Sequence, residues 1–363
     1  MTRPVESLAS RPERPIERIA IIRALHLGDM LLAVPAFRAI RHGFPNAQIT
    51  LISLPWARAF ADRFDSYIDR FAEFGGFPGI DEMDFEPHAS ARFLNEQRAE
   101  KYDLVVQMHG SGRTSNPLAL ALGGVLTIGY HEPGTDPHLD VSSPYPTTAH
   151  EIDRNLGLAA MLGCPAEDRH LEFPLRSADI SEAQKILNDL AIGDRPIIGV
   201  HPGAKYLSRR WMPERFAAVA AAMAEEMSAA VVVTGTDGER ELAADIAGRV
   251  GADAFLIAGA TTLGGLAALI DRMALFISND TGPAHIACAL GTPSVTIFGP
   301  ADIRRWAPEQ NELHAVVHKP VLCSPCGYST CPIDHRCLRS IGVADVLQAA
   351  HRVLNREAET CVA

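Results

Sequence analysis

Residues 278–300, SNDTGPAHIACALGTPSVTIFGP, place short polar side chains directly after an apolar run and at the start of an expected helix. Asp280 is a good N-cap, and Pro283 suits the first helical turn because its missing N–H costs nothing there. The remaining N–H groups and the positive end of such a helix attract anions. An ordinary capped helix explains the same residues about equally well.

The groups of this segment differ in how they suit a phosphate. A negatively charged Asp280 repels phosphate, so we expect it to hold the loop. The Thr281 hydroxyl and the Gly282 N–H are better direct donors, and His285 lies one turn into the helix, where its ring can donate to a phosphate oxygen. For His285, a packed core histidine is the alternative.

A basic segment, HPGAKYLSRRWMPERF at residues 201–216, also follows an expected strand. Lys205, Arg209 and Arg210 can neutralise a diphosphate. The alternative is a solvated basic loop in which Trp211 is anchored in the core. Arginines next to a tryptophan and a helix start favour a binding function.

A carboxylate stands at a third strand end, in IIRALHLGDMLLAVPA at residues 21–36. Gly28 lets the backbone turn closely, and Asp29 begins a helix, where it can accept a proton from an attacking hydroxyl. A plain helix cap is the alternative for Asp29. The segment is not a dinucleotide fingerprint, because it holds one glycine. In VVVTGTDGERELA, Asp237 or Glu239 can bond ribose hydroxyls or cap a helix.

Four cysteines gather in CSPCGYSTCPIDHRCL, namely Cys323, Cys326, Cys331 and Cys337. Their C-x2-C-x4-C-x5-C spacing differs from the paired C-x2-C repeats of zinc ribbons. We therefore expect packed free thiols or a loop that can form a disulfide. A zinc site is the alternative.

The length and composition of the sequence are those of an ordinary globular protein, whose helices and strands must position these groups. At 363 residues the sequence suggests about two domains, and 47% hydrophobic residues supply a sizeable core. A net charge of −11 argues against broad nucleic-acid binding. No apolar run reaches the ~20 residues of a membrane span, and the N-terminus has no secretory pattern, so we expect a cytoplasmic protein.

Short apolar runs alternate with helix-length segments along the whole chain, which predicts βαβ units and parallel sheets. Strands are expected at residues 18–24, 47–54 and 102–108, then at 195–204, 229–235, 254–259, 273–278 and 294–299, and helices at 29–45, 212–227 and 343–359. The two halves meet near Arg176. A ligand is expected at the carboxyl ends of the strands.

The ordered set RALHLGDMLLAVPAFRAIR, HPGAKYLSRRWMPERF, TGTDGERE and SNDTGPAHIACALGTPSVTIFGP resembles glycosyltransferase family 9, which contains the lipopolysaccharide heptosyltransferases. The resemblance covers nearly the whole chain. It implies an α/β GT-B fold of two Rossmann-like doubly wound domains facing across a cleft. Residues 1–175 would form the acceptor-side domain and 176–342 the nucleotide-sugar domain, with a last helix at 343–363 packing back toward the first domain.

The resemblance also implies an inverting, metal-independent transfer of a sugar, typically heptose from ADP-heptose, to a lipopolysaccharide core or a related, lipid-linked saccharide. It implies no cofactor, and the sequence lacks an Asp-x-Asp pair that would hold a cation on a diphosphate. The expected partners are the nucleotide-sugar donor and the saccharide acceptor, without nucleic acid. A lipid-linked acceptor is compatible with peripheral contact between the protein and the cytoplasmic face of the inner membrane.

Carried onto this sequence, the family pattern makes Asp29 the catalytic base and Thr281, Gly282 and His285 the diphosphate loop, held by Asp280. Gly28, Lys205 and Asp237 complete the expected donor contacts. Arg209 stands where the family often has a lysine that contacts the leaving phosphate, and Leu25 and His26 stand where it often has serine. On the acceptor side, the donor-rich loop after the strand at 102–108 offers Gln107, His109, Ser111 and Arg113. A surface loop is the alternative there.

Two other functions fit the same residues. A nucleotide-sugar epimerase of GT-B fold would release nucleotide without an acceptor. A non-catalytic nucleotide-sugar-binding protein would bind the donor and never turn it over, although Asp29 beside a diphosphate loop weighs against that interpretation.

Overall fold

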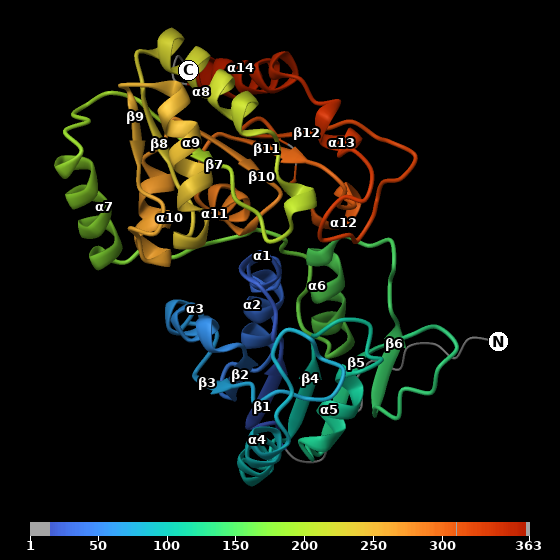
Figure 1. Ribbon diagram of the computed structural model, residues 1–363. Coiled ribbons are helices and arrows are strands. Elements are labelled where there is room, and N and C mark those ends of the chain that lie inside the picture. The colour runs from blue at the N-terminus through green and yellow to red at the C-terminus, as the bar shows by residue number, and fades with distance from the viewer. Residues whose placement is uncertain (1–14, 310, 361–363) are drawn as a thin grey trace. The chain divides into compact units, whose positions relative to one another are not determined.

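The computed structural model describes residues 15–309 and 311–360, and the chain divides into two compact units, Met1–His170 and Leu171–Ala363 (Figure 1). Arg176, near which the sequence places the boundary, lies six residues after it by this division, at the N-cap of α7 (Ser177–Asp189). Residues 1–14, the stretch on which the secretory-signal expectation depends, and 361–363, the end of the expected last segment, lie outside the described residues.

The sheet of the first unit has six parallel strands in the order β3-β2-β1-β4-β5-β6. Their bounds are β1 Arg18–Ile22, β2 Gln48–Ser53, β3 Arg70–Glu73, β4 Leu104–Gln107, β5 Leu126–His131 and β6 Val141–Pro144. The central strands are almost continuously apolar because helices cover both faces of a parallel sheet. The expected strands at 18–24, 47–54 and 102–108 are confirmed as β1, β2 and β4.

The sheet of the second unit is also parallel, in the order β12-β11-β10-β7-β8-β9. Its strands are β7 Ile197–His201, β8 Ala230–Val233, β9 Ala254–Leu256, β10 Leu275–Asn279, β11 Ser294–Phe298 and β12 His314–His318. Counted from the first strand of each unit, both sheets have the order 3-2-1-4-5-6 of doubly wound folds. The winding therefore reverses between β1 and β4 and again between β7 and β10, which are the places where such sheets bind ligands.

The helices of the first unit are α1 Leu27–Leu31, α2 Val34–Gly43, α3 Arg58–Arg63, α4 Pro87–Ala99, α5 Ser115–Ala121 and α6 Glu151–Met161. The single helix expected at residues 29–45 is instead two helices, and that expectation was wrong. Pro35 lies in the first turn of α2 and lacks the N–H that would continue α1, so the chain turns at Leu32 and Ala33.

The helices of the second unit fall into two groups. Helices α8 (Pro213–Met227), α9 (Arg240–Val250) and α14 (Val343–Thr360) pack together, while α10 (Leu263–Asp271) contacts both α7 and α11 (Gly282–Leu290). Short helices α12 (Ile303–Trp306) and α13 (Arg336–Arg339) lie between β11 and α14 in the chain. No helix in the described ranges is long and apolar enough to cross a bilayer.

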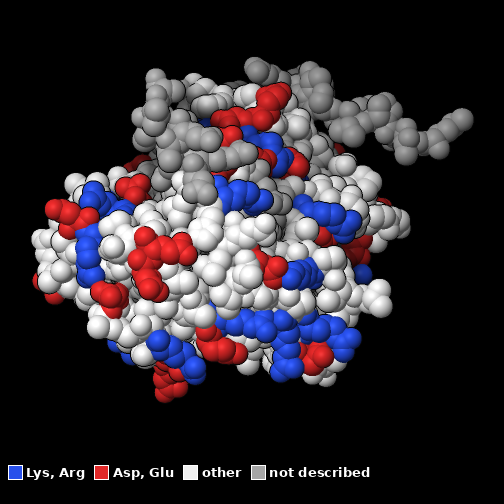
Figure 2. Space-filling view, turned by 90° about the horizontal axis from the view of Figure 1, so that it is seen from above, with Lys and Arg blue, Asp and Glu red and all other residues white. Residues whose placement is uncertain are grey.

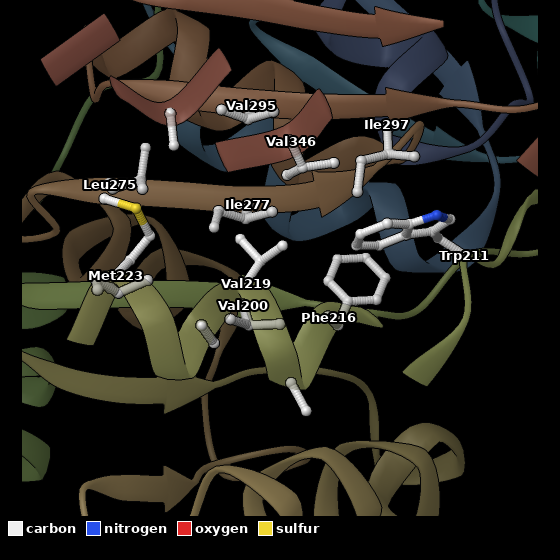
Figure 3. Packing of buried hydrophobic residues seen from close by; sticks show 14 of the residues in the cluster. Val200, Trp211, Phe216, Val219, Met223, Leu275, Ile277, Val295, Ile297 and Val346 are labelled. Atoms are coloured by element: carbon white, nitrogen blue, oxygen red, sulfur yellow. The ribbon is translucent and has the colours of Figure 1, made fainter. Parts of the chain in front are cut away.

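The core of the second unit lies between its sheet and the first helix group (Figure 3). Trp211 and Phe216 meet edge to face at 5.1 Å between ring centroids. Strand residues Val200, Leu275, Ile277, Val295 and Ile297 meet Val219 and Met223 of α8 and Val346 of α14. Helix α14 thus packs on α8, β11 and β12 of its own unit, and its expected packing toward the first domain stays a prediction.

Candidate active site

The basic segment and the Thr281 segment of the second unit lie at one edge of its sheet. Strands β7 and β10 are parallel neighbours with His201 opposite Ser278. The chain leaves β7 at Pro202 and β10 at Asp280, so both segments begin at the point where the winding reverses. The sequence alone predicts that each segment follows a strand, and the strand order brings the two together.

Asn279, the last residue of β10, joins the two segments. Its Nδ2 donates to the Pro202 carbonyl at 2.7 Å, and its Oδ1 accepts from the Trp211 N–H at 3.0 Å. The side chain is fully buried, so both bonds are shielded from water. The basic loop at residues 202–211 is therefore held at both ends. Sequence reasoning missed Asn279, although an amide at the end of an apolar strand is the signal that could have found it.

Arg209 of the basic loop forms an ion pair with Asp280. The Nη1–Oδ2 distance is 3.2 Å, with 30% of the Arg209 side chain exposed and 7% of that of Asp280. The guanidinium of Arg209 and the ammonium of Lys205 also lie 5.3 and 5.2 Å from the ring centroid of Tyr206. Asp280 thus orients a cation whose remaining N–H groups can reach an anion.

Helix α11 begins at Gly282, and its N-cap is Thr281. The sequence-based N-cap, Asp280, was wrong by one residue: it still pairs with the sheet, its N–H donating to the Ile297 carbonyl of β11 at 3.1 Å, and the helix is capped by the next residue. Thr281 is extended, and its side chain makes no hydrogen bond to the first turn. The Gly282 N–H thus lies at the positive end of a nine-residue helix, with His285 buried within it.

Arg210 and Glu239 support the basic loop from the side of β8. Arg210 donates to the Ala204 carbonyl at 3.0 Å and to Glu239 Oε1 at 3.3 Å. The other Glu239 oxygen accepts from the N–H and hydroxyl of Thr236. Burial is the largest single influence and raises the pKa of the Glu239 carboxyl, but the Thr236 N–H and hydroxyl together with His201 and Arg210 lower that pKa by more, so it lies below its usual value.

Asp237 lies beside this pair in a different environment. Its side chain is 87% exposed and pairs with Arg240 at 3.4 Å. A Cβ on Gly259, whose φ is +74°, would come within 2.9 Å of the Asp237 carboxylate. Because Glu239 is committed to internal bonds, Asp237 is the carboxylate of the two that remains accessible to a ligand.

Asp29 lies on α1 in the first unit, directly after the central strand β1, with Gly28 in the same short helix. Its backbone is fixed by Arg23, which is 1% exposed. Arg23 Nε and Nη2 donate to the Asp29 carbonyl at 3.0 and 2.7 Å. Arg23 Nη1 donates to the Met108 carbonyl after β4 at 2.6 Å. One buried guanidinium thus ties together the two loops at this unit's winding reversal.

Helix α6 completes the shell around Arg23. Asn155 Oδ1 accepts from Arg23 at 3.0 Å, and Asn155 Nδ2 donates to the Leu32 carbonyl at the end of α1. Glu151 pairs with Arg23 at 3.3 Å and also with Arg154. A buried guanidinium needs such acceptors to offset its lost hydration. An arginine directly after the four apolar residues of IAII is the signal in the sequence that could have identified Arg23.

Of the proposed acceptor residues, Gln107 ends β4 and the other three follow that strand, and their bonds reach α5 and the segment after β5. Gln107 bonds Asn116 at 2.7 Å, and its Oε1 accepts from the His109 N–H at 2.6 Å. Ser111 and Arg113 both bond Glu132, and 76% of the Arg113 side chain is exposed. The loop therefore lies at the same sheet edge as Asp29, and its role in acceptor binding stays a prediction.

Basic and acidic side chains are interspersed with uncharged ones on the face shown in Figure 2. Along the lower right of this view, basic side chains form a band with acidic ones among them. The cationic groups that matter here are local ones, such as Lys205 and Arg209.

Comparison with known proteins gives matches across nearly the whole chain. The family model described as glycosyltransferase family 9 (heptosyltransferase) matches residues 90–336. Lipooligosaccharide heptosyltransferase 2 of Campylobacter jejuni is 25% identical over 336 residues, covering 90% of this chain and 95% of that protein.

Two solved structures share the fold. A glycosyltransferase of family 9 from Veillonella parvula has a TM-score of 0.77 at 23% identity, covering 95% of this chain and 99% of that one. The E. coli ADP-heptose lipopolysaccharide heptosyltransferase II has a TM-score of 0.73 at 21% identity, covering 94% and 100%.

Proposed function

This chain belongs to glycosyltransferase family 9 and has its GT-B fold, and from that premise we propose that it transfers heptose from ADP-heptose to a lipopolysaccharide core or related saccharide, with inversion at the anomeric carbon. It is an enzyme of the lipopolysaccharide heptosyltransferase type. The proposed donor follows from the E. coli heptosyltransferase II, whose description names ADP-heptose.

In the proposed reaction an acceptor hydroxyl attacks the anomeric carbon of the donor. A C–O bond forms as the bond to the β-phosphate oxygen breaks, and ADP leaves with the bonding electron pair. The Asp29 carboxylate takes the hydroxyl proton in the same step, as a general base. Inversion follows because attack and departure occur on opposite faces of the anomeric carbon.

The departing diphosphate gains negative charge, and the second unit supplies groups that can stabilise it. We assign this role to Arg209 and Lys205, the Thr281 hydroxyl, the Gly282 N–H at the start of α11, and His285. Asp237 contacts the ribose. These groups supply charge stabilisation without a cation on the diphosphate. Holding both substrates in register provides the entropic part of the acceleration.

The proposal rests mainly on one observation. In each unit, the predicted groups follow the strands between which the strand order of the sheet reverses. Asp29 follows β1 in the first unit, and Arg209, Thr281 and Gly282 follow β7 and β10 in the second. Doubly wound sheets bind their ligands at these positions. The Arg209–Asp280 pair beside the start of α11 adds an oriented cation to the same edge.

The Asp29→Asn variant tests the assignment of the base, because it keeps the shape of the side chain and removes its proton affinity. We expect the rate of heptose transfer to fall by about 10²–10⁴-fold. Stabilisation by ADP in thermal unfolding should be unchanged, since the nucleotide contacts are assigned to the second unit. Asp136→Asn is the matched control, because Asp136 is 75% exposed in the same unit and should transfer normally.

Transfer by Asp29→Asn within twofold of the wild-type rate would show that the base is another group. ADP release without any acceptor would instead favour the epimerase alternative. Donor binding without turnover against every saccharide acceptor would favour the non-catalytic binding protein. Thermal shifts with ADP, GDP and UDP distinguish the nucleotide, because a ligand that binds only the folded state stabilises it by about 2.7 kcal/mol at 100 times its Kd.

A further inference from the structure

The side-chain clusters outside the assigned substrate contacts differ in what they can do. The four cysteines between residues 323 and 337 are free thiols, one of the two forms that the sequence predicts. Across residues 15–309 and 311–360 no three His, Cys, Asp or Glu side chains stand as a set of metal ligands, so the zinc alternative finds no support there. The buried cluster around Arg23 is different, because it bonds the turn that carries Asp29.

Helix α1, which carries Asp29, is too short to hold its own position. It has five residues, and a helix of this length is unstable by itself because its few hydrogen bonds do not offset the cost of nucleation. Its place therefore depends on the surrounding packing and on bonds from other elements. Arg23 donates twice to the Asp29 carbonyl, and Asn155 Nδ2 donates to the Leu32 carbonyl at 3.0 Å.

The guanidinium of Arg23 bonds two segments with two different edges. Nε and Nη2 hold the Asp29 carbonyl, whereas Nη1 donates to the Met108 carbonyl at 2.6 Å. Met108 begins the acceptor loop, residues 108–114 between β4 and α5, which carries three of the predicted acceptor residues. Because the donors of a guanidinium lie in one rigid plane, neither carbonyl can move without losing a bond to a charged donor.

Arg23 is itself held in place. Its N–H donates to the Ile52 carbonyl at 3.0 Å, and its carbonyl accepts from the Ser53 hydroxyl at 2.7 Å, so β2 fixes its backbone. Glu151 Oε1 lies 3.3 Å from Arg23 Nη2, and the other oxygen of Glu151 pairs with Arg154. The three charged residues are 1–4% exposed, so water does not compete with these bonds.

We propose that Arg23 is a positioning residue that holds helix α1 and the acceptor loop as one unit, so that the general base and the acceptor hydroxyl keep a fixed separation. Arg23 touches neither substrate and acts through the two backbone carbonyls. The consequence for catalysis rests on the proposed function, whereas the coupling of the two segments does not. Because the donor contacts are assigned to the second unit, loss of Arg23 should affect the acceptor and not the donor.

Hydrogen exchange of the full-length protein, followed by mass spectrometry of its peptides, tests the coupling. Arg23→Lys keeps the charge, but a single ammonium lacks the two edges that reach both carbonyls. We expect exchange at residues 26–33 and 108–116 to rise together by about tenfold, since each segment loses a bond to a charged group. Arg38→Lys is the matched control and should change neither segment, because Arg38 is a buried arginine of the same unit that bonds the His170 carbonyl and pairs with Asp168.

Asn155→Ala is a second and more selective variant. It removes the bond to the Leu32 carbonyl and keeps the donors with which Arg23 holds Asp29 and Met108. We expect faster exchange at residues 26–33 and little change at 108–116. This variant carries the test if Arg23→Lys does not fold: an equal rise in both segments, or a rise in neither, would then overturn the proposal.

Steady-state kinetics with ADP-heptose and a heptose-free lipopolysaccharide core test the catalytic consequence. In Arg23→Lys we expect kcat to fall by about 10–100-fold through misplacement of the base. The KM for the acceptor should rise, and the KM for ADP-heptose should not change. A purely structural role would lower the folded fraction, and with it kcat, and leave both KM values as they are in the wild type.

A folded Arg23→Lys protein in which only one segment, or neither, exchanges faster would overturn the coupling. A loss of kcat with an unchanged KM for the acceptor would overturn the positioning role. A wild-type protein that does not transfer heptose counts against the proposed function alone. The exchange measurement needs no substrate, so it still decides whether Arg23 couples the two segments.

Discussion

At the residue scale, Arg209, which pairs with Asp280, contributes both a positive charge and an oriented planar guanidinium. Substitutions at this position can test the two contributions separately. The family often places lysine where this chain has Arg209, and a lysine keeps the charge but loses the planar fork. We predict that Arg209→Ala lowers the rate of transfer by about 10²–10³-fold, because a cation that stabilises the leaving diphosphate is lost. Arg209→Lys should fall between Arg209→Ala and the wild type. Steady-state rates with saturating acceptor measure both effects.

Arg304→Ala is the control for this series, since Arg304 is 65% exposed, pairs with Asp302 and has no role in the proposed mechanism. Arg209→Ala also removes one partner of the buried Asp280 carboxylate, at a cost of about 1–3 kcal/mol of stability. Unfolding measured in parallel separates that loss from the catalytic one. Equal rates for Arg209→Ala and Arg304→Ala would remove Arg209 from the mechanism.

At the element scale, the loop between β7 and α8 packs a glycine, Gly203, directly against the carboxylate of Glu239. A Cβ at Gly203 would lie 2.2 Å from Glu239 Oε1. Gly203→Ala must therefore displace the carboxylate that holds Arg210 and Thr236. We predict a loss of about 1–3 kcal/mol in the free energy of unfolding, measured by denaturant titration.

Gly248→Ala provides a matched control in the same unit. Gly248 lies within α9, and nothing stands within 4 Å of an added Cβ. Alanine there should stabilise the protein by up to about 1 kcal/mol through helix propensity. If both alanines shift the unfolding midpoint alike, the Glu239 contact does not constrain the loop.

The element scale also shows what the sequence can predict. Apolar runs such as RIAII and MALFIS predict strands because burial on both faces demands them, and each functional segment follows one. The sequence does not state which strands are neighbours, since pairing depends on contacts between distant segments. The bonds of Asn279, the buried Arg23 and the one-residue delay of α11 all depend on that pairing, so they were not predicted.

At the scale of the whole molecule, buried histidines make stability depend on pH. His314 on β12 bonds Ser294 at 2.9 Å, and burial lowers its pKa from 6.5 to about 4. Burial likewise lowers the pKa of His201 on β7. Because the unfolded chain binds these protons first, the folded state keeps its full stability above about pH 6.5 and loses it as the pH falls toward 4.

We predict that lowering the pH from 7.5 to 4.5 destabilises the full-length protein by up to about 3 kcal/mol through His314 alone. Thermal unfolding across this range measures the loss. His314→Asn, which retains a side chain able to bond Ser294, should show a shallower dependence. A variant with the same slope as the wild type would show that the loss comes from other groups.

The amide of Asn279 has a mechanical consequence for how a ligand is gripped. Asn279 at the end of β10 bonds both ends of the basic loop, at the Pro202 carbonyl and at the Trp211 N–H. Lys205 and Arg209 lie between these two bonds. When an anion attracts Lys205 and Arg209, the two bonds of Asn279 limit how far the loop can follow. We therefore expect the two side chains to move together and over a short distance. Replacing the uncharged Asn279 should change the affinity for a nucleotide as much as replacing Lys205 or Arg209.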